Sequence, residues 1–170
     1  MSKKEDFTDP SNLMDVCINY IGDWNVKSSF VLEGRSGAGK SQFLIQLMRQ
    51  LNHLYRTGQI VFIKVYYFRL REYSESYLQS NNIMKPLEAV IRESLQSIEI
   101  KSTKLLFLLD GYDEYNNKMI KIDKDLIPTD EFPNTKIILT VREKYATPAD
   151  YSRVFGNEKG YSIHFICPFN

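Results

Sequence analysis

The 170-residue sequence lacks several features that mark whole classes of protein. No apolar run approaches the roughly eighteen residues that a membrane-spanning helix needs. The first nine residues are too polar for a secretory signal peptide, so we expect a cytoplasmic protein. Only two cysteines are present, Cys17 and Cys167, and they stand far apart without metal-like or redox-like spacing. We interpret both as small buried apolar residues.

The sequence also has no excess of charge of one sign. Its 22 Lys and Arg residues nearly cancel its 21 Asp and Glu residues, for a formal net charge of +1. No strong field therefore indicates a nucleic-acid or membrane partner. Internal repeats and proline-rich linkers are absent as well. The 43% apolar and 25% charged content is typical of one soluble globular domain with a sizeable core.

What the sequence does have is a regular alternation of strand-like and helix-like segments. We expect residues 1–9 to lack regular structure, and residues 71–85 and 111–134 to form long connections. Such alternation predicts an α/β three-layer sandwich around a mostly parallel sheet of about five strands. The predicted strands are residues 29–33, 60–68, 105–109, 136–141 and 161–166, and the predicted helices are residues 11–21, 40–55 and 86–98.

Between the first predicted strand and the second predicted helix lies a complete G-x-x-x-x-G-K-S motif. Glycines allow a tight turn in which successive N–H groups point at phosphate oxygens. The following helix adds its unpaired N–H groups and positive dipole end, Lys40 reaches the β- and γ-phosphates, and the Ser41 hydroxyl binds Mg²⁺. The predicted phosphate-binding residues are Gly34, Arg35, Ser36, Gly37, Ala38, Gly39, Lys40, Ser41 and Gln42.

The strand at residues 105–109 ends in Asp110, which places a carboxylate at the carboxyl edge of the sheet, where ligands bind in open α/β folds. We predict that Asp110 holds the magnesium ion through a water molecule, opposite Ser41. The residue after it is Gly111, which cannot activate water. A catalytic base must then be Asp113 or Glu114, with Lys40 as the third catalytic residue. The alternative is that both acids are solvated.

The segment 106–114 is similar at every position to the acidic motif of the NACHT family of signal-transduction ATPases: an apolar strand, Asp, a small residue, an apolar residue, then Asp-Glu. Residues 137–142 resemble the family strand whose terminal arginine, here Arg142, senses the γ-phosphate. A weaker match covers residues 61–73. The resemblance implies the sheet order of additional-strand ATPases, with the strand of Arg142 between those of the phosphate loop and Asp110.

Two departures from the family pattern stand out. Val141 and Glu143 occupy positions where the family usually has Ser and Pro. The sequence also ends where the family's helical and winged-helix segments begin, so we expect residues 28–170 to form the NTPase core alone, preceded by an N-terminal segment, residues 1–27, with a short helix. We expect residues 13–26 to supply apolar walls for the adenine.

The resemblance implies a regulatory domain that binds Mg-ATP or Mg-ADP, hydrolyses ATP slowly and acts as a signalling switch, with protein partners or self-association in a longer chain. Two alternatives remain open. One is a small P-loop kinase, whose lid arginines would be Arg69 and Arg71; the other is a scaffold module that keeps nucleotide without turnover. A GTPase is disfavoured because the sequence has no Asn/Thr-Lys-x-Asp guanine-reading motif.

Overall fold

The computed structural model describes residues 4–7, 10–25, 29–72, 93, 102–115, 132, 134–155 and 160–166. Strands and helices alternate along most of this length. The elements are β1 (Lys4–Phe7), α1 (Pro10–Gly22), β2 (Ser29–Gly34), α2 (Lys40–Arg56), β3 (Lys64–Arg69), β4 (Leu105–Asp110), the 3-10 helix η1 (Tyr112–Glu114), β5 (Thr135–Arg142), α5 (Pro148–Phe155) and β6 (Tyr161–Ile166).

The described strands form one sheet in the order β1-β6-β2-β5-β4-β3, and each neighbouring pair is parallel. Strand β5 lies between β2, which leads into the phosphate loop, and β4, which ends at Asp110. This is the additional-strand order that the family resemblance implies. The carboxyl ends of β2, β5 and β4 therefore meet at one edge of the sheet.

The N-terminal strand β1 corrects one expectation. Residues 4–7 were expected to lack regular structure, but they pair in parallel with β6 from Lys4 opposite Ile163 to Phe7 opposite Ile166. The tetrapeptide Lys-Glu-Asp-Phe gives no alternating apolar signal. Because the pairing of an edge strand uses backbone groups, it does not require such a signal. The sheet thus has a sixth strand beside the five that were predicted.

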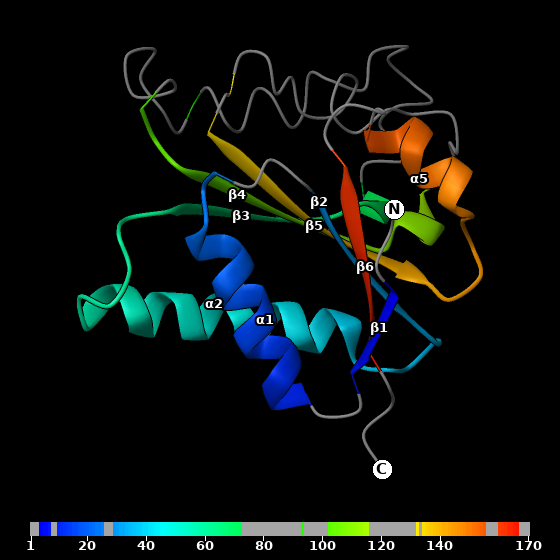
Figure 1. Cartoon of the computed structure of the whole chain (residues 1–170), viewed down its shortest axis with the longest axis horizontal. Helices are drawn as coiled ribbons and strands as arrows, with labels where there is room; N and C mark the ends of the chain where they lie inside the picture. The colour runs from blue at the N-terminus through cyan, green and yellow to red at the C-terminus, as the bar shows by residue number, and fades with distance from the viewer. Residues whose placement is uncertain are drawn as a thin grey trace.

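Helices cover both faces of the sheet, as Figure 1 shows: α1 and α2 pack on one face, and α5 on the other. Successive residues of a strand point to opposite faces, so β2 and β4 contribute to two separate cores. Leu32 and Leu108 pack with Leu13 and Leu44 under α1 and α2. On the opposite face of the sheet, Val31 and the strand residues beside it pack with α5 residues such as Val154. This is the predicted three-layer sandwich.

Helix α5 was not predicted from the sequence. Its tyrosine, Tyr151, is buried and donates a hydrogen bond of 2.6 Å to Glu33 Oε1 on β2. That contact gives the buried carboxylate a hydrogen-bond donor, as a buried charge requires. Burial and the nearby Glu33 raise the pKa of the Tyr151 phenol, so the phenol stays protonated and remains a donor.

The second predicted strand begins later than expected. The apolar run from residue 60 predicted a strand, but β3 starts at Lys64, and Val61 and Phe62 are exposed. The predicted helix at 86–98, apart from residue 93, and most of the two long connections lie outside the described residues. Cys17 is buried, as predicted, whereas Cys167 lies outside the described residues. Within the described part of the chain, no helix combines the length and apolarity needed to cross a membrane.

Candidate nucleotide-binding site

The phosphate loop connects β2 to α2, and its glycines serve two different purposes. Gly37 and Gly39 adopt left-handed backbone conformations, with φ of 76° and 85°, which side-chain-bearing residues rarely adopt. Gly34 has another role, because a Cβ at this position would lie 2.5 Å from Ile166 Cγ2 on β6. The two later glycines therefore shape the loop, while the first permits close packing of neighbouring strands.

Lys40, the first residue of α2, folds back over the loop. Its Nζ donates hydrogen bonds to the main-chain oxygens of Gly34 (2.8 Å) and Arg35 (3.0 Å). Burial lowers the pKa of Lys40, and the carboxylates of Asp113 and Asp110 partly oppose that shift. The ammonium thus stabilises the conformation of the loop.

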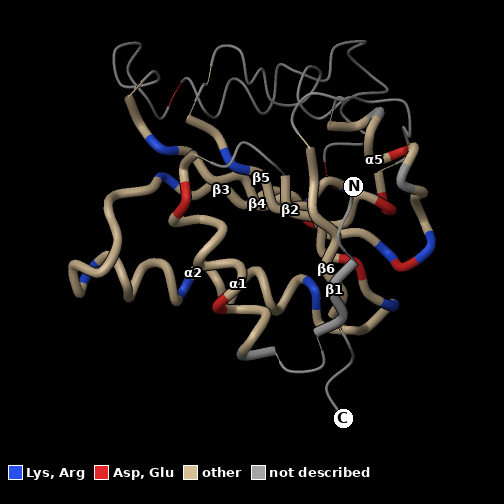
Figure 2. Tube along the Cα trace, viewed as in Figure 1, with Lys and Arg blue, Asp and Glu red and all other residues tan. Residues whose placement is uncertain are grey.

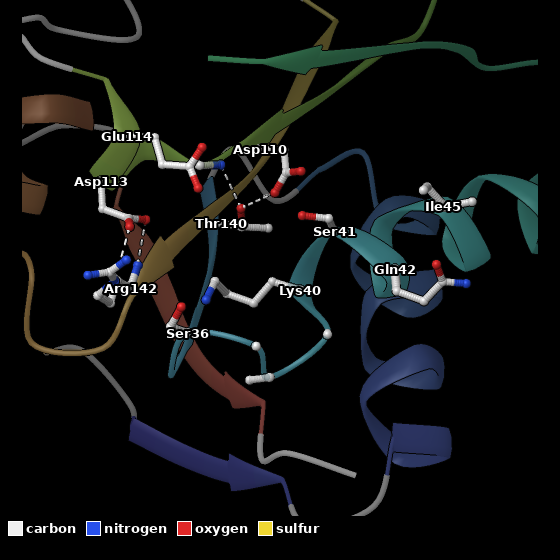
Figure 3. Close-up of a pocket in the computed structure, with 14 residues that line it drawn as sticks. Ser36, Lys40, Ser41, Gln42, Ile45, Asp110, Asp113, Glu114, Thr140 and Arg142 are labelled. Carbon is white, nitrogen blue, oxygen red and sulfur yellow. Dashed lines mark hydrogen bonds and ion pairs between the residues drawn. The ribbon is translucent and has the colours of Figure 1, made fainter. Parts of the chain in front are cut away.

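A pocket of about 400 Å³ opens beside the loop, at the edge where β2, β4 and β5 end (Figure 3). It gathers most of the residues that the sequence singled out. Gly34 and Arg35 do not line it, and Arg35 instead pairs its Nε with Glu143 Oε2 at 3.3 Å on the surface. The lining comprises Ser36, Gly37, Ala38, Gly39, Lys40, Ser41, Gln42, Ile45, Asp110, Gly111, Asp113, Glu114, Thr140 and Arg142.

Asp110 is held by hydroxyl groups from both neighbouring strands. Thr140 on β5 donates to its Oδ1 at 2.7 Å, and Tyr67 on β3 donates to its Oδ2 at 2.8 Å. Thr140 also accepts a 2.9 Å hydrogen bond from the backbone N–H of Gly111. These contacts fix the orientation of a buried carboxylate at the mouth of the pocket.

Ser41 and Asp110 line the same pocket, and Figure 3 shows the Ser41 hydroxyl turned toward the side on which Asp110 lies. A hydroxyl and a carboxylate are hard oxygen donors, the kind that Mg²⁺ prefers, and Mg²⁺ commonly completes its shell with water and phosphate oxygens. The donor set therefore fits magnesium. Gln42 lines the pocket, but its side chain points away from the acidic residues in the same view.

Arg142 reaches the pocket from the end of β5 and pairs with Asp113. Its Nε lies 3.4 Å from Asp113 Oδ2, and its backbone N–H donates to Asp113 Oδ1 at 2.9 Å. Glu114 has a weaker and more exposed partner, Arg71, at 3.9 Å. The two acids that the sequence left as alternative bases therefore have different environments. Asp113 is tied to Arg142 through both oxygens, while Glu114 is freer.

Sequence reasoning missed Thr140 and Tyr67. Hydroxyl-bearing residues are common in β-strands, so nothing in the sequence distinguishes these two. Only their position beside Asp110 identifies them as residues of the site. None of residues 13–25 lines the described pocket, and their expected contact with adenine stays a prediction. The apolar residues Leu13, Cys17 and Ile21 instead pack into the core with Phe30 and Leu32, because they form the apolar face of α1.

The sheet order, the phosphate loop and the acid at the end of β4 together define a P-loop NTPase. The NACHT domain family model matches residues 28–154. The chain therefore belongs to the NACHT family and is a nucleotide-binding P-loop NTPase. No curated protein matches the sequence significantly.

Solved structures share the fold at low sequence identity. Drosophila ORC bound to DNA superposes with a TM-score of 0.57 at 13% identity, over 91% of this chain and 40% of that one. C. elegans PCH-2 gives a TM-score of 0.60 at 12% identity, over 96% of this chain and 45% of that one. The chain thus spans less than half the length of either protein. At this identity the likeness shows the fold alone.

Proposed function

We propose that this domain binds Mg-ATP and Mg-ADP, hydrolyses ATP slowly and changes its interactions with nucleotide state. The observation that carries the proposal is the meeting of the phosphate loop, Asp110 and Arg142 at one pocket. This arrangement provides donors for phosphate oxygens, two oxygen ligands for a metal ion and a cation for a third phosphate. Those are the parts that P-loop NTPases need to distinguish a triphosphate from a diphosphate.

In the proposed magnesium site, Ser41 and Asp110 are the protein ligands, with Asp110 acting through water. Magnesium would neutralise charge on the β- and γ-phosphates. The hydroxyls of Thr140 and Tyr67 keep the Asp110 carboxylate oriented, and each carboxylate oxygen retains a free lone pair for a further hydrogen bond.

Of the two candidate bases, the geometry favours Glu114. Both oxygens of Asp113 contact Arg142, and freeing them would break that pair. Glu114 lines the pocket with an exposed side chain, and Arg71 approaches it only to 3.9 Å. An acid whose position is not fixed by several partners is a poor orienting group for water, so we expect slow turnover.

A switch follows from the position of Arg142. With its charge engaged by Asp113, the arginine holds the end of β5 against η1. A γ-phosphate is a stronger partner for guanidinium than a single carboxylate oxygen, and would compete for it. We propose that ATP draws Arg142 from Asp113 and that ADP leaves the pair intact, which would expose a different surface to protein partners or other copies in the cytoplasm.

The kinase alternative has less support. It needs Arg69 and Arg71 as lid residues free to bind phosphate. In this structure Arg69 pairs with Glu72 at 3.6 Å, and Arg71 with Glu114 at 3.9 Å.

A thermal-unfolding series with nucleotides tests the proposed function. Ligand at about a hundred times its dissociation constant adds roughly 2.7 kcal/mol of stability. Mg-ATP and Mg-ADP should therefore raise the melting temperature by several degrees, and GTP by less. A GTP shift as large as the ATP shift would contradict the adenine assignment, and no shift with any nucleotide would contradict nucleotide binding altogether.

A further inference from the structure

The C-terminal half of α2 carries an apolar surface that the nucleotide site does not use. Tyr55, Val61 and Phe62 are 47%, 59% and 57% exposed, and they are the exposed large hydrophobic residues of the described part of the chain. The rings of Tyr55 and Phe62 contact each other edge to face, with centroids 5.6 Å apart. Tyr55 and Phe62 therefore form one patch, with Val61 next to Phe62 in the chain, and such a patch is the pattern of an interaction surface.

Beside this patch lies a groove of about 290 Å³. One wall is the α2 stripe of Met48, Leu51 and Tyr55, which repeats at spacings of three and four and so lies on one helix face. The other wall comes from the segment after α2, with Phe62 and Val65. A groove between a helix and an extended segment, with aromatic residues at its rim, suits the apolar face of another helix.

The groove is separate from the nucleotide pocket. The two cavities share no lining residue. Met48 to Tyr55 stand 8 to 15 residues beyond Lys40 on the same helix, which corresponds to about 12 to 22 Å at 1.5 Å per residue. A partner in the groove would therefore leave the phosphate loop open.

The excess of basic residues around the groove indicates which kind of partner it binds. From residue 34 to residue 71 the sequence has seven Lys and Arg residues and no Asp or Glu. Arg49 and Arg56 are exposed on α2, and Figure 2 shows basic residues but no acidic ones along this helix. They stand three residues before and four residues after Asn52, which lines the groove, so both neighbour that residue on the helix surface. Neither arginine lines the groove itself, but both place positive charge beside its Asn52 side.

We propose that this groove docks an amphipathic helix of another protein, with large apolar side chains on one face and carboxylates beside them. The apolar face would fill the groove over Leu51 and cover Phe62 and Tyr55. The carboxylates would face Arg49 and Arg56. Charge at such a rim sets partner choice and association rate more than total affinity, so it discriminates against a basic helix.

Two peptides of about 18 residues, five helical turns, test the proposal. They share one Leu- and Phe-bearing face and differ only in having Glu or Lys on the polar face, and each carries a fluorophore. Binding is measured by fluorescence anisotropy at low and high salt. We expect the Glu peptide to bind at least tenfold more tightly, about 1.4 kcal/mol, with the difference shrinking as salt rises. Equal binding of both peptides, or binding of neither, overturns the proposal.

Variants of the whole chain then locate the site. Val61→Ser with Phe62→Ser should weaken the Glu peptide at least tenfold, and because both side chains are exposed, the unfolding transition should persist. Arg49→Glu with Arg56→Glu should reverse the preference toward the Lys peptide. Ala149→Glu, exposed on α5 on the other face of the sheet, is the matched control and should leave affinity nearly unchanged. Reversed-charge variants with an unaltered preference overturn the proposal.

Two further outcomes identify a different occupant or place. Displacement of the Glu peptide by Mg-ATP would put the peptide in the nucleotide pocket and overturn the proposal. A concentration-dependent dimer in sedimentation that the Phe62→Ser change abolishes would make the occupant a second copy of this chain, which also overturns it. A monomer that binds the Glu peptide regardless of Mg-ATP supports it.

Discussion

Arg142 and Gly34 are register partners in the parallel pairing of β5 with β2, so the last residue of β5 lies directly across from the first residue of the phosphate loop. The backbone N–H of the following residue, Glu143, donates to the Gly34 oxygen at 3.1 Å and extends this contact. The side chain of Arg142 thus starts beside the loop, although 108 residues separate the two positions. This placement underlies the first prediction.

Removal of the Arg142 side chain should affect ATP far more than ADP. A charge-assisted contact to a third phosphate contributes about 1.5 to 3 kcal/mol, so Arg142→Ala should weaken a non-hydrolysable ATP analogue by at least tenfold. ADP lacks that phosphate, and its affinity should change little. Titration calorimetry with Mg²⁺ and each nucleotide measures both values.

Asp113→Asn is the matched variant for Arg142. It retains the arginine but weakens its ion pair, so ATP affinity should stay level or increase. Equal losses for ATP and ADP in Arg142→Ala would show that the arginine only supports the structure.

Replacement of Lys40 by Ala should weaken ATP binding at least tenfold, about 1.4 kcal/mol or more. In the proposed complex the ammonium is the main cation opposite the β- and γ-phosphates, and its hydrogen-bond partners within the described residues are the Gly34 and Arg35 oxygens. Isothermal titration gives the affinity. Arg49→Ala removes one charge from the same helix outside the pocket and should have little effect. Unchanged affinity in Lys40→Ala would refute the phosphate-loop assignment.

Thr140 should control how strongly magnesium assists nucleotide binding. Thr140→Val removes the hydroxyl that orients Asp110 Oδ1 and leaves the Gly111 N–H without its acceptor. We expect the ratio of ATP affinity with Mg²⁺ to that with EDTA to fall severalfold, while Thr140→Ser, which keeps the hydroxyl, preserves the ratio. Affinity in EDTA separates loss of nucleotide binding from loss of metal assistance. An unchanged ratio in Thr140→Val would exclude this positioning role.

Hydrolysis should be slow and should depend on Glu114. We expect fewer than about one ATP per second, at or below the lower end of usual enzyme rates, and a further loss of at least tenfold in Glu114→Gln. Asp113→Asn should reduce the rate less, because that carboxylate is engaged by Arg142. Phosphate release under saturating Mg-ATP measures each rate. A larger loss in Asp113→Asn would reverse the assignment of the base.

Stability should depend on pH through Lys136, far from the nucleotide pocket. Its Nζ donates to the main-chain oxygens of Tyr20 and, at 2.7 Å, Asp23 at the end of α1. Burial lowers the pKa of Lys136 from 10.5 to about 8, with Asp23 opposing the shift. Because the folded state holds this proton more weakly than the unfolded state, deprotonation favours folding, and the free energy of unfolding should rise from about pH 8 to pH 10.5.

Lys136→Met is the reference protein for this measurement, because it lacks only the Lys136 titration and shares all other titratable groups with wild type. Urea unfolding at about pH 7 and about pH 10 should show wild type gaining stability relative to the variant by on the order of 2 kcal/mol. A difference that stays constant with pH would mean that Lys136 titrates normally.

The amino-acid sequence by itself determined the phosphate loop, the carboxylate at the end of β4 and the α/β alternation. These features are local. A glycine pattern sets the loop conformation, an apolar run sets a buried strand, and the residue after that run falls at its carboxyl end. The position of β5 between β2 and β4 came from resemblance to a family, because strand order is not written in any one segment.

Only the tertiary structure decided which groups meet at the site. Thr140 and Tyr67 reach Asp110 from 30 and 43 residues away, and Tyr151 reaches Glu33 across 118 residues. No spacing rule predicts such pairs, because they depend on which strands become neighbours and in what register. The same applies to β1, whose pairing uses backbone groups that every sequence carries. Local chemistry determines most of the strands and helices, and strand pairing determines which residues meet at the site.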